Sequence, residues 1–491
     1  MPMQTPLRQW LILAALIAAI GLVHVGFQRS GHVWGDDFAE YWMHARNLAL
    51  GQPYASIDYV YNPHYPQIGP PTYPPGCPMV LAPLYWLWGL NLTAFKLEMV
   101  FFFLAFLGAV YLCFRQELGF PKAAALVAIL GLNHFFLKDT NTIGSDMPFL
   151  ALLYLGIFLV KKADGTPSTS GQRWLYFALA GLVVYLSFST RTLGALVIPA
   201  MWAQELISKR RISRPVLLAT LVFASLAVLQ SLFLHSDRHY LDQFNAGPMV
   251  LVHNAMGYLI RLTTFWHNGF LKVPSLGLFG LVTFLAVLGY VDRLRRRVTV
   301  CEAFAAIYLV VILLWPSYQG ERYLYPIVPL YLFYAFGGLE HRWIAGRARL
   351  RRAVVATLAL AIGLTYAARL AGSERGPLAE GVAKRESAEL FDYVHRTTSD
   401  QDVLVFIKPR ALALFTQRKA SVYHQPDSDQ KLWEYFRQIG ATRLVVAEND
   451  EAFKNVEEPE RLAFLRAFAK RNRERLESVY ANRDFTVYKI K

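Results

Sequence analysis

Cysteine is almost absent from this sequence, which has three cysteines in 491 residues. In the topology derived below, Cys113 and Cys301 lie at the cytoplasmic ends of apolar runs, and only Cys77 lies on the opposite side. No pair is therefore available for a disulfide framework. The sequence also lacks a glycine-rich phosphate loop and an internal repeat. These absences exclude a disulfide-stapled domain, a P-loop nucleotide-binding domain and a repeat protein.

Charged residues are also scarce, at 17% of the chain, while hydrophobic residues make up 55% and the mean hydropathy is positive. Such a composition indicates a membrane protein with several spans. The net charge of +15 comes from short basic gaps between apolar runs, such as "SKRRISR" from residue 208 and "DRLRRR" from residue 292. Loops of this kind stay on the cytoplasmic side. Topology therefore explains the basic charge, and no nucleic-acid partner is expected.

The basic gaps also set the number of spans, because a hairpin of two spans separates each cytoplasmic loop from the next. The first apolar run follows a single positive residue, Arg8, and has no small-x-small cleavage signature, so it is interpreted as an uncleaved signal-anchor. The predicted spans are 10–28, 93–114, 122–138, 146–161, 172–188, 190–206, 215–234, 274–291, 301–316, 324–341 and 351–370. Eleven spans after a cytoplasmic N-terminus place the C-terminus outside.

One further apolar stretch, residues 77–90, is short and contains two prolines. Counting it as a span would move every later basic loop to the outside. It is therefore predicted to lie on the outer face as an interfacial or re-entrant segment. The predicted membrane domain covers residues 1–371, with a large first external loop at 29–92. The fold class is a polytopic α-helical membrane protein.

From about Gly372 the chain becomes charged, and short β-type runs alternate with helical ones. Strands are predicted at "DVLVFI" (402), "RLVVA" (443) and "FTVYKI" (485), and helices begin near residues 384 and 458. Residues 372–491 are predicted to form a soluble α/β domain on the extracytoplasmic side. It is expected to support acceptor recognition or stability without a catalytic group of its own. The bases in "KPRALALFTQRK" (408–419) can be surface charge alone.

The first external loop opens with the acidic stretch "WGDDFAEYW", residues 34–42. Asp37, Tyr41 and Ala45 share one face of a predicted helix that ends at Gly51. One interpretation is that Asp37 only caps this helix, in a capping box with Glu40. Capping does not explain the later segment "IGPPTYPPGCP", whose prolines fold the chain back toward the membrane.

Four segments together resemble the C-fold (GT-C) glycosyltransferases that use polyprenyl-phosphate sugars, in particular bacterial members similar to protein O-mannosyltransferases and lipid A aminoarabinose transferases. The first-loop pattern is "GDDFAEYWMHARNLALGQPYA" followed by "YPPGCPMVLAPLYWLWGLN", in which Asp37, Tyr41 and Tyr73 match the family spacing. The others are "DTNTIGSDMPF" (139), "STRTLGALVIP" (189) and "GERYLYPIVPLY" (320). Many relatives have Asp-Glu where this chain has Asp37-Phe38, and here an extra acid, Asp36, precedes the pair.

Sugar transfer from a lipid phosphate starts with a good leaving group, so the enzyme must deprotonate an acceptor hydroxyl and hold the phosphate. The resemblance implies that Asp37 is the general base, with Asp36 as its rival. Asp36 or Glu40 is expected to raise the pKa of Asp37 by like-charge repulsion. Asp146 could orient the acceptor or the sugar, and its alternative role is to cap the fourth span.

Arginines at the outer ends of spans are the candidates for phosphate binding. Arg191 and Arg322 occupy such positions, where a cation needs water or an anion, although either could snorkel to the interface. The other candidate substrate-binding residues are Glu40, Tyr41, Tyr73 and Tyr323. No cofactor is required by this chemistry. Histidines His235, His239, His253 and His267 leave a divalent metal as an alternative, but no His-Glu-x-x-His pattern supports one.

The function that these patterns favour is an inverting membrane glycosyltransferase of the inner (plasma) membrane. Its partners would be a polyprenyl-phosphate sugar donor, an acceptor (lipid, glycan or protein) and membrane lipid. The alternatives are a transporter or flippase of lipid-linked sugars and an assembly protein whose external domain binds a partner. Transporters usually show internal repeats and charges within spans, which are not evident here.

The predicted topology can be tested with reporter fusions. Alkaline phosphatase fused after Lys491 should be active, because an odd number of spans carries the C-terminus out of the cytoplasm. A cytoplasmic reporter at the same position should be inactive. The opposite pair of results would show that the span count is wrong by one.

Overall fold

The computed structural model describes residues 7–233, 247–267, 272–316, 318–341, 344, 346–453 and 459–491. Most of these residues are helical. Six described helices are long and apolar enough to cross a membrane, which confirms the polytopic fold class. They are α1 (Leu7–Gly26), α4 (Leu92–Gly131), α7 (Gly171–Thr190), α9 (Arg214–Phe233), α11 (Lys272–Arg296) and α15 (Ala348–Ala371).

Shorter helices occupy the other predicted spans, so the count of eleven stays a prediction. They are α6 (Asp146–Asp164), α8 (Val197–Lys209), α12 (Val300–Leu313) and α13 (Val328–Leu339). The 40-residue α4 is broken at Gly119, whose φ of 71° is non-helical, just before Pro121. The two parts of α4, before and after this break, therefore cover the second predicted span and the first part of the third. The end of the third is the separate helix α5 (His134–Asp139), and η2 (Thr192–Leu196) leads into α8.

Small residues let the membrane helices approach closely. At the crossing of α11 and α13, Gly289 faces Tyr334 and Gly338 faces Leu285. A Cβ on either glycine would collide with the backbone of the other helix. Such contacts replace the hydrophobic driving force that is missing inside a bilayer. The same bundle holds α6 between α4 and α7, so the outer ends of these helices are fixed relative to one another.

The first external loop is folded, and it contains α2 (Asp37–Ala49), β1 (Tyr59–Val60), η1 (Pro66–Ile68) and α3 (Gly76–Trp88). The predicted helix is α2, and Gly51 follows it with a φ of 66°. The apolar stretch 77–90 is α3, which packs against α2, α4 and α7. Its Trp86 and Trp88 are 72% and 56% exposed. Whether α3 lies in the membrane surface stays a prediction.

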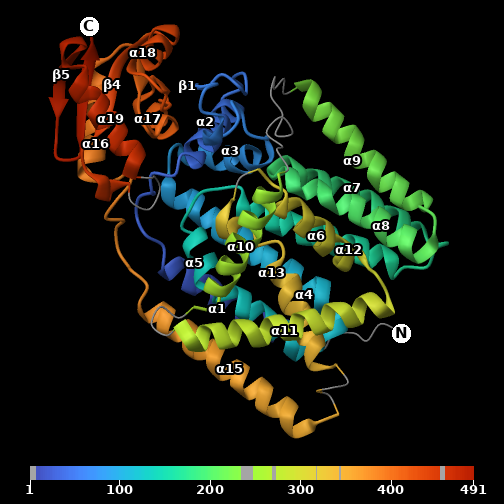
Figure 1. Ribbon diagram of the computed structural model, residues 1–491. Helices are drawn as coiled ribbons and strands as arrows, with labels where there is room; N and C mark the ends of the chain where they lie inside the picture. The colour runs from blue at the N-terminus through green and yellow to red at the C-terminus, as the bar shows by residue number, and fades with distance from the viewer. Residues whose placement is uncertain are drawn as a thin grey trace.

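The C-terminal part is an α/β unit whose helices cover a mixed sheet, drawn in orange and red in Figure 1. The strands are β2 (Val403–Val405), β3 (Lys419–Ser421), β4 (Ala441–Ala447), β5 (Leu476–Ala481) and β6 (Phe485–Ile490). The helices are α16 (Arg385–Thr397), α17 (Pro409–Thr416), α18 (Asp429–Gln438) and α19 (Pro459–Arg471). All three predicted strands are present, as β2, β4 and β6.

The sheet also includes a strand from the first external loop. The strand order is β1-β3-β2-β4-β6-β5, and β1 pairs in parallel with β3 so that Tyr59 lies opposite Ala420. Figure 1 shows the α/β unit beside α2 and β1, and α17 contacts both. The loop and the C-terminal unit are therefore one structure at this end of the molecule.

An aromatic cluster joins the start of the loop to the α/β unit. Trp34 is 1% exposed. Its ring centroid lies 5.3 Å from that of Phe453, 5.7 Å from Phe406, 5.8 Å from Phe391 and 5.9 Å from Phe485. Burying such a large ring among aromatic partners is a strong source of packing energy. Trp34 is thus a main hydrophobic contact between the two parts.

Replacing Trp34 with alanine should loosen the α/β unit. A buried Trp→Ala change costs about 3–5 kcal/mol of unfolding free energy, because it removes the ring and leaves a cavity. We expect trypsin to cut the connection 372–384 faster in Trp34→Ala than in the natural protein. Trp86→Ala, which removes an exposed ring, is the control. Equal cleavage rates in the two variants would show that Trp34 does not hold the unit in place.

Candidate active site

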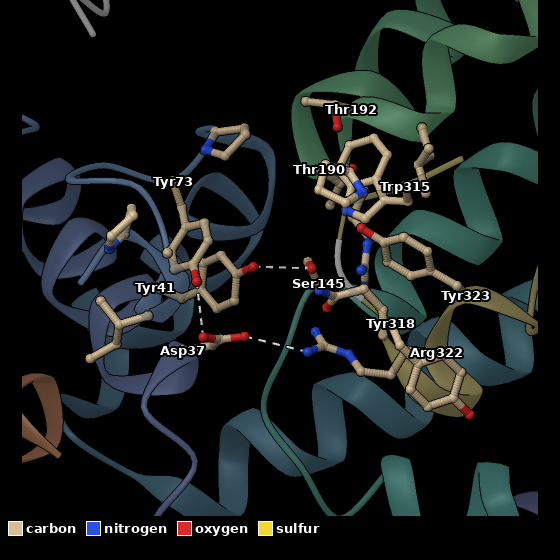
Figure 2. A pocket seen from close by; sticks show the side chains of 18 residues that line it. Asp37, Tyr41, Tyr73, Ser145, Thr190, Thr192, Trp315, Tyr318, Arg322 and Tyr323 are labelled. Atoms are coloured by element: carbon tan, nitrogen blue, oxygen red, sulfur yellow. Dashed lines mark hydrogen bonds and ion pairs between the residues drawn. The ribbon is translucent and has the colours of Figure 1, made fainter. Parts of the chain in front are cut away.

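A cavity of about 700 Å³ lies between the first external loop and the outer ends of the helices. Its wall includes six residues predicted from the sequence, which come from segments far apart in the chain: Asp37, Tyr41, Tyr73, Arg191, Arg322 and Tyr323. Figure 2 shows the tyrosines of the loop on one side and Arg322, Tyr323 and Trp315 on the other. The four segments of the sequence motif thus meet around one space.

Asp37 occupies the first turn of α2 and lies at the edge of this cavity. Its carboxylate accepts a hydrogen bond from the Tyr73 hydroxyl at 2.9 Å and one from Arg322 Nη1 at 3.4 Å (Figure 2). Arg410 Nη1, from α17, lies 3.4 Å away on the Tyr73 side. The Asp37 side chain is nevertheless 37% exposed. It is held by its neighbours but can still be reached by a ligand.

The expected rise in the pKa of Asp37 is wrong. Burial does raise this pKa, but the charges of Arg322 and Arg410 and the hydrogen bond from Tyr73 outweigh it, so that the pKa lies below its usual range. The prediction failed because it considered only the acids close in sequence. The two arginines approach from residues 322 and 410, which no local pattern connects to Asp37.

Asp36 does not line this cavity, and its carboxylate faces the C-terminal unit. It is 7% exposed, and its carboxylate accepts the backbone N–H groups of Ala411 at 3.1 Å and Arg410 at 3.4 Å. These groups begin α17, so Asp36 binds the positive end of that helix. Asp36 is also the N-cap residue of α2, but no side-chain hydrogen bond caps α2. The capping box with Glu40 is not formed.

Glu40 lies behind Asp37 and does not line the cavity. Its side chain has no exposed surface. One carboxylate oxygen lies 2.6 Å from Arg410 Nε, and the other lies 3.4 Å from His44 Nε2. A buried acid of this kind needs such a partner to offset its lost hydration. The structure therefore places Glu40 beside a buried cation and not on the wall of this cavity.

Asp146 is linked to Asp37 through Arg322, and it binds both predicted arginines. Its carboxylate is paired with Arg191 and accepts a hydrogen bond from Arg322 Nε at 2.8 Å. Ser145 is the N-cap residue of α6, and its side chain makes no cap. Instead, the Ser145 hydroxyl accepts a hydrogen bond from Tyr41 at 3.1 Å. The Arg191 guanidinium lies 5.4 Å from the ring centre of Tyr323.

The charged groups form a chain of alternating sign. In order, they are Glu40, Arg410, Asp37, Arg322, Asp146 and Arg191. Each interior member touches two groups of opposite charge, which fixes side chains that would otherwise be free to rotate. The three acids and three arginines balance within the chain. This arrangement keeps Asp37 ionised and oriented at the cavity.

A second cavity, of about 280 Å³, lies on the other side of Asp37 and Arg322. Four aspartates and two cations line it: Asp36, Asp37, Asp139, Asp146, Arg322 and Lys408. The charged groups on the wall of the larger cavity are Asp37, Arg191 and Arg322. Burial raises the pKa of Asp36 to about 6 and that of Asp139 to about 7, so these two acids are partly protonated near neutral pH. The larger cavity therefore presents cations to an anion, and the smaller one presents carboxyl groups to a hydrogen-bonding ligand.

Sequence reasoning missed Arg410 and Asp139. Asp139 stands in the quoted motif at 139–149 and could have been chosen on that basis. Arg410 belongs to the basic stretch 408–419, and the interpretation of its bases as surface charge is wrong for this residue, whose side chain has no exposed surface. The histidines fall in a segment that contains α10 (Pro248–Thr264). His235 and His239 lie outside the described residues. Among the residues that are described, no group of three or more histidines, cysteines or acids could hold a metal ion.

Comparisons by sequence found no match, either among protein-family models or among curated proteins. Solved structures do match. ArnT from Cupriavidus metallidurans bound to undecaprenyl phosphate is 13% identical, with a TM-score of 0.58 over 99% of this chain and 98% of that chain. The Archaeoglobus fulgidus oligosaccharyltransferase tethered with an acceptor peptide is 11% identical, with a TM-score of 0.60 over 89% of this chain and 69% of that chain.

The mycobacterial arabinofuranosyltransferase AftD is a third match, 14% identical, with a TM-score of 0.52 over 98% of this chain and 40% of that chain. All three solved proteins are glycosyltransferases of the GT-C fold. At these identities the likeness shows the fold. It confirms the GT-C-like membrane architecture that the sequence motifs predicted.

The buried Asp36 should make the stability of the protein depend on pH. Burial raises its pKa to about 6 despite the nearby charges of Arg410 and Lys408. The folded protein therefore binds a proton between pH 6 and 4 that the unfolded chain does not. This adds about 3 kcal/mol of stability at low pH, which is lost as the pH rises through about 6.

Asp36→Asn should remove that contribution, because asparagine does not titrate. We expect the difference in thermal unfolding midpoint between this variant and the natural protein to change with pH from 4 to 7. A difference that stays constant over this range would mean that Asp36 is ionised throughout.

Proposed function

We propose that this protein is an inverting membrane glycosyltransferase, which moves a sugar from a polyprenyl-phosphate donor to a hydroxyl of a lipid, glycan or protein. The reaction would take place at the outer face of the plasma (inner) membrane. The observation that carries the proposal is the position of Asp37, an ionised carboxylate between two cavities of different charge. The fold supports it, because solved structures with this fold include ArnT with undecaprenyl phosphate and AglB with dolichol-phosphate.

The larger cavity suits the donor. Arg191 and Arg322 line it, and each guanidinium has five N–H donors, so it can hold Asp146 and a phosphate oxygen at the same time. Tyr41, Tyr73 and Tyr323 add aromatic surface and hydroxyl groups for the sugar. The proposal includes no cofactor, since the arginines supply the positive charge that a departing phosphate needs.

Asp37 is placed to act as the general base. It borders both cavities as an ionised carboxylate, so it can take the proton of an acceptor hydroxyl that enters from the smaller cavity. Its lowered pKa makes it a weaker base than a free aspartate, so its contribution comes from its placement. The acceptor oxygen then bonds to the anomeric carbon while the bond to the phosphate oxygen breaks. Polyprenyl phosphate leaves with its electron pair. A single displacement of this kind inverts the anomeric centre.

The reaction can be tested with purified full-length protein and three radiolabelled donors: undecaprenyl phosphate carrying a neutral hexose, a pentose or an amino sugar. A bacterial membrane extract supplies acceptors. We expect label from one donor to appear in a new product. A transporter would instead carry the intact donor across the bilayer of a proteoliposome. An assembly protein would do neither. The proposal would be rejected if no label were transferred even from a wider set of donors.

Asp37→Asn should fold but barely turn over. The substitution keeps the size of the side chain and removes the base, which should lower the rate about a hundredfold to ten-thousandfold. Asp36→Asn is the comparison variant. Asp36 lines the smaller cavity, but its carboxylate accepts the backbone N–H groups at the start of α17, so we expect a smaller loss of rate than in Asp37→Asn. Loss of activity in Asp36→Asn alone would move the base by one residue. Near-normal rates in both variants would remove this loop from the chemistry.

A further inference from the structure

Arg410 reaches Asp37 from the C-terminal α/β unit. It stands at the start of α17 and has no exposed side-chain surface. Its guanidinium lies 2.6 Å from Glu40, 3.4 Å from Asp37 and 3.3 Å from the Tyr73 hydroxyl. A further N–H group donates to the carbonyl of Pro70 at 3.4 Å. Every one of these partners belongs to the first external loop.

The loop is shaped around this guanidinium. The group lies between the rings of Tyr59 and Tyr73, 4.8 and 5.3 Å from their centres. Gly69 passes beside it with a φ of 128°, and a Cβ there would lie 2.8 Å from Arg410 Nη2. The Asp36 carboxylate accepts a hydrogen bond from the backbone N–H of Arg410. The tyrosine rings, Gly69 and the Asp36 carboxylate therefore form a binding site for the Arg410 guanidinium.

Arg410 also compensates the charge of a buried acid. Glu40 is buried within the loop, and Arg410 is the cation beside it. Without Arg410, a buried carboxylate one turn of α2 from Asp37 would keep only His44 as a partner among the described residues, at 3.4 Å, which is a costly arrangement. The position of Asp37 thus depends on a residue that arrives only when the α/β unit is docked.

We propose that Arg410 is a positioning residue, which the C-terminal unit inserts behind Asp37 so that the site is complete only in the docked protein. The inference rests on the proposed function, since it assigns Arg410 to the same site. Arg410 holds Asp37 and Tyr73 in place and does not touch the substrate. Docking of the α/β unit is then a condition for transfer, and a partner that displaced this unit would stop it.

The first measurement needs no turnover. The label on Asp37 from a water-soluble carbodiimide with glycine ethyl ester, followed by mass spectrometry from about pH 2 to 7 and divided by the label on a free aspartyl peptide at each pH, reports its protonation. The scan starts low because the pKa of Asp37 lies below its usual range. The groups that face Asp37 are Arg322, Arg410, Tyr73 and Tyr41. Removing one of the two cations should shift the labelling midpoint upward on the order of one pH unit.

Two variants keep the test interpretable. Arg410→Met combined with Glu40→Gln removes both buried charges, so the loop is not left with an unpaired acid, and Glu40→Gln alone is its reference. Arg461→Met is the matched control. Arg461 lies in the same interface between the rings of Tyr65 and Tyr423, at 4.2 and 5.2 Å. It should affect docking without moving the labelling midpoint of Asp37.

The second measurement is transfer from the same three undecaprenyl-phosphate donors. We expect the double variant to lose at least tenfold in kcat relative to Glu40→Gln and to shift the acid limb of its pH profile upward. Arg410→Lys keeps the positive charge but loses the planar guanidinium. Compared with the double variant, it should return the acid limb of the pH profile to its natural position and recover only part of kcat. Arg461→Met should keep the natural pH profile.

The two measurements separate two kinds of failure. An unchanged labelling midpoint in the double variant would overturn the role of Arg410, whether or not the protein transfers sugar. A shifted midpoint in a protein that transfers no sugar from any donor would leave the contact intact and reject the proposed function. Equal shifts in the double variant and Arg461→Met would mean that general loosening of the interface, and not Arg410, acts on Asp37.

Discussion

The site depends on one carboxylate held between two arginines. Asp37 belongs to the first external loop, Arg322 precedes α13, and Arg410 begins α17 in the C-terminal unit. A partly buried acid is costly unless positive charge and hydrogen bonds offset its lost hydration. The convergence of the three segments therefore holds the pKa of Asp37 below its usual range despite its burial. The strand β1 and the ring of Trp34 supply the packing that holds the loop and the α/β unit together while this happens.

The same charges divide the space around Asp37. On one side, Arg191 and Arg322 face a roomy cavity with aromatic walls, and on the other side aspartates outnumber cations. Asp37 and Arg322 line both cavities. Under the proposed function, the base and a phosphate-binding arginine would therefore both border the place where donor and acceptor meet. Rigid placement of this kind contributes to catalysis because the reacting groups are already oriented.

Local patterns in the sequence predicted much of the site. The helix with Asp37 and Tyr41, the later Tyr73 and the arginines at helix ends all line one cavity, because each motif fixes its own short segment. What the sequence could not supply were contacts between segments. Arg410 and the two-residue strand β1 acquire their roles only through partners more than 300 residues away. The direction of the Asp37 pKa and the turn of Asp36 toward α17 follow from those contacts, so they could not be predicted either.

The central claim is that the cationic cavity holds the donor phosphate with Asp37 at its edge. The most direct measurement is a cryo-EM structure of the full chain with undecaprenyl phosphate. The account predicts phosphate oxygens within hydrogen-bonding distance of Arg191 or Arg322, with the Asp37 carboxylate facing the position of the anomeric carbon. A phosphate bound in the acidic cavity, or away from both arginines, would contradict it.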